Sequence, residues 1–152
     1  MTFNDDDLKA KAQATVDAFA NAYNNKHGSK IPVPVSTSFE LELSKPRCAG
    51  IAIGHERIEL NMTLYRDYPK EFLNEVIPHE VAHLAQTSLN MIGGDHSPQW
   101  RKLMESMYRK ARKHHTMDTK KAIAVYDEHK TAVRAAKAMK RKSLDVKSAD
   151  LF

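Results

Sequence analysis

The stretch "IPHEVAHLAQ", residues 77–86, arranges two histidines and a glutamate in the pattern His-Glu-x-x-His. Residues four apart on a helix are rotated by only about 40°, so the rings of His79 and His83 project from one helix face and can bind one ion. Glu80 lies about 100° further round, where it can reach a ligand of that ion without coordinating the ion itself. The spacing therefore requires a helix and predicts a metal site on its surface.

A catalytic zinc site takes three protein ligands and keeps one position open for water. His96 is the predicted third ligand, because its Gly-Gly loop can turn the chain back over the helix that carries His83. Asp95 is the competing ligand, or alternatively a residue that orients a histidine. The remaining histidines are predicted to be polar surface or loop residues: His27, His55, His114, His115 and His129.

His-Glu-x-x-His on a helix is the signature of zinc metallopeptidases. Zinc lowers the pKa of a bound water toward ~7 and polarises a carbonyl group. Glu80 is the predicted catalytic base, which accepts a proton from the attacking water and returns it to the leaving amine. The pattern thus predicts one Zn²⁺ and peptide hydrolysis without a covalent intermediate, and leaves open which group stabilises the oxyanion. The alternative is a purely structural helix and loop.

The chain has a single cysteine, Cys48, which excludes an internal disulfide and a four-thiolate zinc ribbon. We interpret Cys48 as a small buried strand residue. No stretch approaches the ~18 apolar residues of a membrane span. The opening "MTFNDDDLKA" is acidic and has no apolar run, unlike a secretory signal or a transit peptide. We therefore expect a soluble, cytoplasmic protein, and the 152 residues fit one globular domain.

Hydrophobic periodicity predicts helices at both ends of the chain and strands between them. The stretch "NDDDLKAKAQATVDAFANAYNN" predicts a capped amphipathic helix that ends near "NNKHGSK". A sheet of three or four strands is predicted from "IPVPV", "SFELEL", "CAGIAIG" and "ERIELN". The order of these elements indicates an α+β fold.

From Pro69 the pattern is helical again, and Pro78 predicts a kink just ahead of His79. "GGDHSP" is typical of a loop, "PQWRKLMESMYRKARK" of a helix with Trp100 and Met107 facing inward, and residues 119–142 of a last helix. The end, "KSLDVKSADLF", has no periodicity and is predicted to be mobile.

Charge is distributed unevenly along the chain. Residues 1–100 hold 9 Lys or Arg against 13 Asp or Glu, a net of −4, whereas residues 101–152 hold 15 against 6, a net of +9. A basic C-terminal third favours a polyanionic partner, and DNA contacted mainly through its phosphate backbone is the prediction. The alternative is a solvated helix face that binds nothing.

Three stretches resemble the SprT-like metalloproteases, a family that includes bacterial SprT proteins and the eukaryotic protease Spartan. They are "AGIAIGHERIELN", "EVIPHEVAHL" and "HSPQWRKLMESM", and the resemblance covers roughly residues 5–115. It implies a zincin-like protease domain at residues 1–117, followed by a basic helix and flexible tail at 118–152. It also implies a bacterial or phage-like host, and activity on proteins bound or crosslinked to DNA, which activates such enzymes.

Two departures from the family pattern affect the prediction. Ser97 stands where the family usually has glycine after the third histidine, and the C-terminal cysteine zinc ribbon of bacterial members is replaced by the basic helix. One zinc ion is therefore expected, not two. The final "SADLF" is similar to peptides that dock on the replication sliding clamp, with Ser148 in place of the usual glutamine.

Two rival functions stay open beside the DNA-coupled protease. One is a metallopeptidase that acts independently of DNA and whose basic helix only packs on the domain. The other is a zinc-containing DNA-binding or adaptor protein without significant catalysis. An intact Glu80 counts against the second, because a structural site needs only its ligands.

Overall fold

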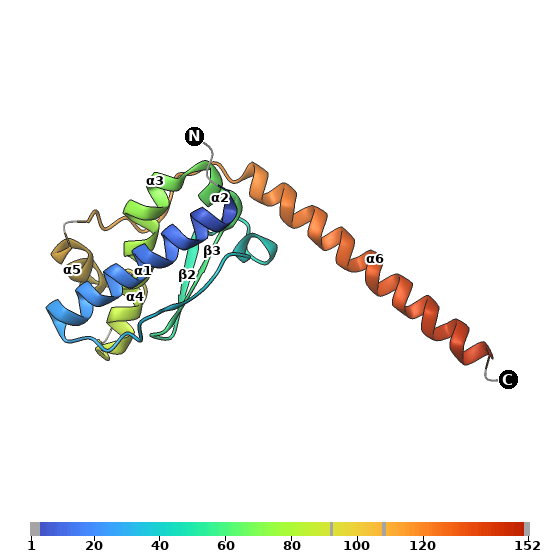
Figure 1. Ribbon diagram of the computed structural model, residues 1–152, viewed down its shortest axis with the longest axis horizontal. Helices are drawn as coiled ribbons and strands as arrows, with labels where there is room; N and C mark the ends of the chain where they lie inside the picture. Colours follow the sequence, from blue (N-terminus) through green and yellow to red (C-terminus); the bar gives the residue numbers. More distant parts are fainter. Residues whose placement is uncertain (1–3, 92, 108, 151–152) are drawn as a thin grey trace.

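The computed structural model describes residues 4–91, 93–107 and 109–150, with side chains as far as residue 144. Figure 1 shows a body of helices and a small sheet, from which one long helix projects. The elements are α1 (Asp5–His27), β1 (Ser36–Ser38), the 3₁₀ turn η1 (Leu41–Leu43), β2 (Gly50–Ile53), β3 (Arg57–Leu60), α2 (Met62–Asp67), α3 (Pro69–Glu71), the π-helical turn η2 (Phe72–Val76), α4 (Ile77–Ser88), α5 (Pro98–Ser106) and α6 (Lys120–Asp150). The predicted α+β class is correct.

The sheet has three strands in the order β1-β3-β2, within the predicted three or four. β3 is central, pairing parallel with β1 and antiparallel with β2. This order leaves β2 at an edge of the sheet. Helix α4 packs against α1, α5 and β2, so it lies at the centre of the body. None of the helices in the described part of the chain is long and apolar enough to cross a membrane.

Helix α1 begins and ends as the sequence predicts. The Asn4 side chain caps it by accepting a hydrogen bond from the Asp7 N–H at 2.8 Å, and three acids occupy its first turn. Gly28 ends it in the left-handed conformation, with φ 69°. One face is buried in the core through Leu8, Ala12, Val16, Ala20 and Tyr23.

Two of the predicted strands are wrong or too long. "IPVPV" forms no strand, because Pro32 and Pro34 cannot donate the N–H groups that a ladder needs. Of "SFELEL", only Ser38 belongs to a strand, β1; Glu40 makes an isolated bridge with Asn61, and the chain then turns into η1. The turn buries both Leu41 and Glu42, two neighbours that a strand would have placed on opposite faces.

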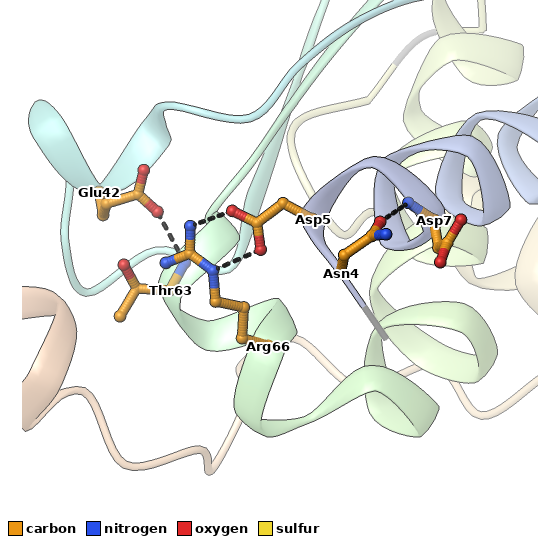
Figure 2. Close-up of polar contacts among 6 residues, drawn as sticks. All are labelled: Asn4, Asp5, Asp7, Glu42, Thr63 and Arg66. Carbon is orange, nitrogen blue, oxygen red and sulfur yellow. Dashed lines mark hydrogen bonds and ion pairs between the residues drawn. The ribbon is translucent and has the colours of Figure 1, made fainter. Parts of the chain in front are cut away.

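Burial of Glu42 is explained by α2, a short helix that the sequence patterns did not predict. Glu42 Oε2 accepts a hydrogen bond from the Thr63 N–H at 2.8 Å, and the Asn61 side chain accepts one from the Leu64 N–H. Both bonds satisfy donors at the helix start, and Figure 2 shows the one between Glu42 and Thr63. On the exposed side of α2, Arg66 makes a bidentate ion pair with Asp5 of α1.

Replacing Glu42 by alanine is expected to lower the free energy of unfolding by about 1.5–3 kcal/mol, because a charged hydrogen bond is lost and the Thr63 N–H stays buried without it. Denaturant unfolding of the full chain measures this. Asp5→Ala is the comparison, since the exposed Arg66 pair is screened by water and its loss should cost clearly less. A larger effect for Asp5→Ala would contradict this account of the α2 start.

The helical stretch from Pro69 is irregular ahead of His79, where Pro78 predicted a kink. The irregularity takes the form of the π-helical turn η2, in which the Ile77 N–H bonds to the Phe72 carbonyl. Pro78 follows as the second residue of α4, and the backbone stays helical from η2 into α4, with Val76 and Ile77 both in the right-handed helical region. The histidine pair is therefore carried on a helix that continues from η2, and the π-helical turn lies where the proline cannot donate an N–H to the preceding turn.

The last two helices differ in length from their predictions. α5 ends at Ser106 and not near residue 113, because residues 109–119 form an irregular segment. α6 continues to Asp150, so most of "KSLDVKSADLF" is helical, which the sequence pattern did not predict. The sliding-clamp motif "SADLF" lies outside the residues whose side chains are described. Of the apolar stripe of α6, Ala122 is buried and Val133 is exposed.

Cys48 is neither buried nor in a strand. It lies half-exposed in the loop that leads into β2. The prediction failed because the apolar run "CAGIAIG" enters the sheet only at Gly50.

Candidate metal centre

Helix α4 presents two histidines on one face, as the four-residue spacing requires. The Nε2 atoms of His79 and His83 lie 3.2 Å apart, and both rings are half-buried. The rest of α4 is anchored by buried residues on its other faces, among them Val81, Leu84 and Ala85. The helix is therefore held rigidly while the two imidazoles point away from the core.

The loop after α4 brings His96 back over the helix. Its Nε2 lies 2.9 Å from that of His79. His96 has φ 57°, a left-handed conformation that is strained for a residue with a side chain. Gly93, with φ 150°, permits the return: a Cβ there would lie 2.8 Å from the Ser97 side chain.

Gln86 and Ser97 hold this loop in place. The buried Gln86 amide donates to Ser97 Oγ at 3.0 Å, and Ser97 Oγ in turn accepts the Trp100 N–H at the start of α5. Ser97 is thus the N-cap of α5. The departure from the family's glycine therefore has a structural use, because a glycine would supply no capping oxygen.

The three histidine nitrogens fit one metal ion. Ligand atoms of His79, His83 and His96 all lie within 4.8 Å of one another. Among the described residues, these three form the one cluster of His, Cys, Asp or Glu side chains that could hold a metal ion. Nitrogens bound to one tetrahedral zinc at about 2.0–2.1 Å are separated by about 3.3 Å. The measured 3.2 Å and 2.9 Å are close to that separation. Asp95 is exposed and outside the group.

A second layer of contacts fixes the rings. Trp100 is fully buried behind the cluster, stacks on His83 at a centroid distance of 5.3 Å, and donates from Nε1 to the His79 carbonyl at 3.2 Å. The backbone of Arg112 also lies close to the His79 ring, where it favours the protonated imidazole and partly offsets the fall in its pKa.

Burial and mutual repulsion keep the cluster uncharged. Burial, followed by the charges of His83 and His96, lowers the pKa of His79 to about 3. Burial and His96 lower the pKa of His83 to about 4, and burial also lowers the pKa of His96. Neutral imidazoles are the form that binds metal, so these rings are ready as ligands at neutral pH.

Glu80 lies beside the cluster in a protected position. It is 6% exposed, and its Oε1 is 3.7 Å from His79 Nε2. Burial, with a smaller contribution from the charge of Asp95, raises the pKa of Glu80 to about 8. The metal-free contact is therefore between two neutral groups, not an ion pair. Gly50 of β2 makes room for it, since a Cβ there would lie 3.1 Å from Glu80 Cγ.

The cluster opens into a cleft of about 970 Å³. One wall is β2 with the loop before it, another is η2 and α4, and a third is the segment between α5 and α6. We call this segment, residues 109–119, the strap. Half-buried Ile51 and Ala52 of β2 give the cleft an apolar side. Its size is at the upper end of the range for ligand sites in proteins.

Several functional neighbours were not predicted from the sequence. Gln86 and Trp100 carry no motif signal for a role behind a metal site, although Trp100 was correctly predicted to face inward. His114 and His115 were predicted to be polar loop residues; they do lie in a loop, but that loop lines the cleft. His27 instead contacts Ser106 Oγ at the far ends of α1 and α5, and His55 is exposed.

The shifted histidines predict how acid affects the metal-free protein. An unfolded histidine takes up a proton near pH 6.5, whereas folded His79 and His83 do so only near pH 3 and pH 4. The folded state binds fewer protons in this window, so the stability of the chelated chain should fall as pH drops below 6.5. Glu80, with its raised pKa, has the opposite effect, but two histidines outweigh it.

Thermal unfolding of the chelated chain between pH 7 and pH 4.5 measures this effect. His83→Ala should show a shallower fall in Tm, and a Tm that rises on acidification would contradict the prediction.

The fold and the cluster together define an α+β protein with a three-histidine site able to bind a metal ion. The model of the SprT-like family matches residues 13–129, and the chain belongs to this family. It is 39% identical over 101 residues to Protein SprT of Vibrio parahaemolyticus serotype O3:K6, covering 66% of this chain and 58% of that protein.

Two further relatives bear the same name. Identity is 30% over 115 residues to Protein SprT of Actinobacillus succinogenes, covering 74% and 65% of the two chains. Identity is 37% over 75 residues to Protein SprT of Pseudomonas savastanoi pv. phaseolicola, a match that covers 47% of this chain and 43% of that protein. The chain thus spans less than two thirds of the length of each of these proteins. No solved structure matches it.

Proposed function

We propose that this protein is a zinc-dependent endopeptidase that cuts proteins bound to DNA. The observation that carries the proposal is the convergence of three neutral histidine nitrogens, with Glu80 beside them, at the floor of a cleft of about 970 Å³. A merely structural zinc site is closed by four protein ligands, whereas three ligands and an open cleft are typical of catalytic sites. Membership of the SprT-like family supports the same class.

In this proposal His79, His83 and His96 hold the ion through Nε2. Bound there, zinc would supply Lewis acidity, a water of lowered pKa and a positive charge that favours the ionised form of Glu80. The Glu80 carboxylate accepts a proton from the attacking water at one of its oxygens. It returns that proton to the amine nitrogen as the peptide C–N bond breaks. Trp100 and the Arg112 backbone keep the His79 ring in place throughout.

The substrate backbone has a natural place beside β2. This strand lies at the edge of the sheet and its residues line the cleft. An extended peptide can pair with such an edge through main-chain hydrogen bonds, which hold it regardless of its side chains. Gly50, next to Glu80, would then lie close to the scissile bond. The cleft therefore favours an unfolded protein segment over a compact one.

α6 supports the proposed contact with DNA. Between residues 120 and 144 it carries eight Lys or Arg against two acids, and from residue 127 its described side chains are exposed. Its main contacts with the body are with η1 and α2, and it then projects away (Figure 1). Its 31 residues extend about 46 Å, longer than one turn of a DNA duplex. Such a helix suits phosphate contacts without base recognition.

The test is cleavage of a basic DNA-binding protein by the zinc-loaded chain, with and without single-stranded or double-stranded DNA. In addition, an α6 variant replaces four basic residues at helical spacing by glutamine: Lys130, Arg134, Lys137 and Arg141. Its matched control makes the same charge change on the body: Lys9, Lys30, Lys45 and Lys70 to Gln. DNA affinity is measured against salt by fluorescence anisotropy.

We expect cleavage that requires DNA, and a salt slope that falls by about 3–4 in the α6 variant but not in the control. Cleavage indifferent to DNA would instead favour a DNA-independent metallopeptidase. DNA binding through α6 without cleavage of any substrate would favour the adaptor protein. Equal salt slopes in the two variants would remove α6 as the DNA contact.

A further inference from the structure

The strap lies over the metal centre in a defined position, although it has no regular secondary structure. Six consecutive strap residues, 112–117, line the cleft together with Lys110. On the α4 side, the Arg112 backbone contacts the His79 ring, and the Arg112 guanidinium lies 4.0 Å from Glu75 of η2. The strap therefore starts its crossing at one wall of the cleft.

His115 fastens the strap to the opposite wall. Its Nε2 lies 2.7 Å from the Arg47 carbonyl, in the loop that leads into β2, while its Nδ1 accepts the Met117 N–H at 3.1 Å. A carbonyl only accepts and an N–H only donates, so the ring carries its proton on Nε2 and is neutral. Both nitrogens are used in structural contacts. His115 therefore has a structural role: it ties the strap to the loop before β2, and neither ring nitrogen is available to contact a substrate.

His114 is the strap residue that faces the metal centre. Its ring centroid is 6.3 Å from that of His96 at an interplanar angle of 72°, and its side chain is exposed to the cleft. The two neighbouring strap histidines thus have different partners: His115 contacts Arg47, and His114 contacts His96. The described residues that line the cleft include no tyrosine, and the Arg112 guanidinium is placed beside Glu75.

We propose that His114 is a catalytic residue that donates a ring N–H to the substrate carbonyl oxygen as this oxygen gains negative charge, and that His115 is the positioning residue that holds it there. The inference rests on the proposed peptidase function. His114 forms only a hydrogen bond: no proton leaves it, and the proton transfers remain with Glu80. A neutral imidazole suffices, because one ring nitrogen always carries a hydrogen. Donors of this kind lower the barrier because the hydrogen bond strengthens in the transition state.

The first test compares His114→Ala with His55→Ala, the same substitution at an exposed histidine that does not line the cleft. Removing one such donor costs about 10²–10³-fold in kcat. We expect that loss for His114→Ala, with KM and zinc content unchanged, and wild-type values for His55→Ala. Wild-type kcat in His114→Ala would overturn the proposal, and so would loss of zinc from that variant.

A second readout does not depend on turnover. A phosphinic peptide carries an anionic tetrahedral centre, so the zinc-loaded His114→Ala chain should bind it about 100-fold more weakly while binding the matching uncleaved peptide normally. Equal phosphinic-peptide affinity in the two chains overturns the role of His114 even if the wild type cleaves nothing. Absence of Glu80-dependent cleavage in the wild type would instead count against the proposed function, so the two failures are distinguishable.

The role of His115 is tested by replacement and by a double variant. Glutamine at this position can still donate to the Arg47 carbonyl and accept from the Met117 N–H, so His115→Gln should keep kcat. His115→Ala should lower kcat as His114→Ala does, and the double variant should be no slower than His114→Ala alone. Additive losses would show that His115 acts independently, and overturn its positioning role.

Discussion

Glu80→Gln is expected to keep its bound zinc and to lose cleavage by about 10²–10⁴-fold in kcat. Glutamine preserves the size of the side chain in its tight place against Gly50, but it cannot accept the proton of the attacking water. Zinc content is unchanged because the three ligand atoms belong to the histidines. The measurement is single-turnover cleavage by chains loaded with equal zinc, quantified by metal analysis.

A control separates the loss of the base from a general disturbance of the buried site. Glu80→Asp keeps the carboxylate but shortens its reach, so it should fall between the wild type and Glu80→Gln in kcat. Full activity in Glu80→Gln would remove Glu80 as the base and leave the metal site with another role.

His96→Ala is expected to weaken zinc binding more than 100-fold, beyond the roughly 10–100-fold effect of losing a partner outside the coordination shell. The two remaining ligands on α4 cannot enclose an ion alone. Wild-type protein should gain about 2.7 kcal/mol of stability at a free zinc concentration of 100 times its Kd. The variant should gain almost none in the same denaturant titration.

His55→Ala is the matched control, because this histidine is exposed and is not among the residues that line the cleft. It should bind zinc as the wild type does. Wild-type zinc affinity in His96→Ala would mean that another residue completes the site, and exposed Asp95 would be the first to examine by the same substitution.

The geometry of the cluster could be predicted because its determinants are local. The spacing of His79 and His83 follows from the helix period, and the return of His96 follows from a Gly-rich loop of limited length. Their roles as zinc ligands and the role of Glu80 stay predictions until metal and activity are measured. The N-cap of α1 and its buried face could also be predicted from the sequence, because they depend on residues within a few positions of one another.

The errors come from interactions between segments far apart in the chain. η1 replaces a strand because the Glu42 carboxylate reaches the start of α2, 21 residues on. The strap escaped prediction because its contacts, from Arg112 to His79 and from His115 to Arg47, join three separate segments and leave no periodic pattern. The regular helical pattern of residues 107–113 was therefore misleading: tertiary contacts outweigh local helix preference there.

The most direct test of the central claim is mass spectrometry of cleavage products formed in H₂¹⁸O by the zinc-loaded chain with DNA and a basic DNA-binding protein. Hydrolysis by water should place one ¹⁸O atom in each new C-terminal carboxylate. The products should disappear on chelation, return with one equivalent of zinc, and be absent with Glu80→Gln. Products that persist in the chelated chain, or that form equally with Glu80→Gln, would contradict the account.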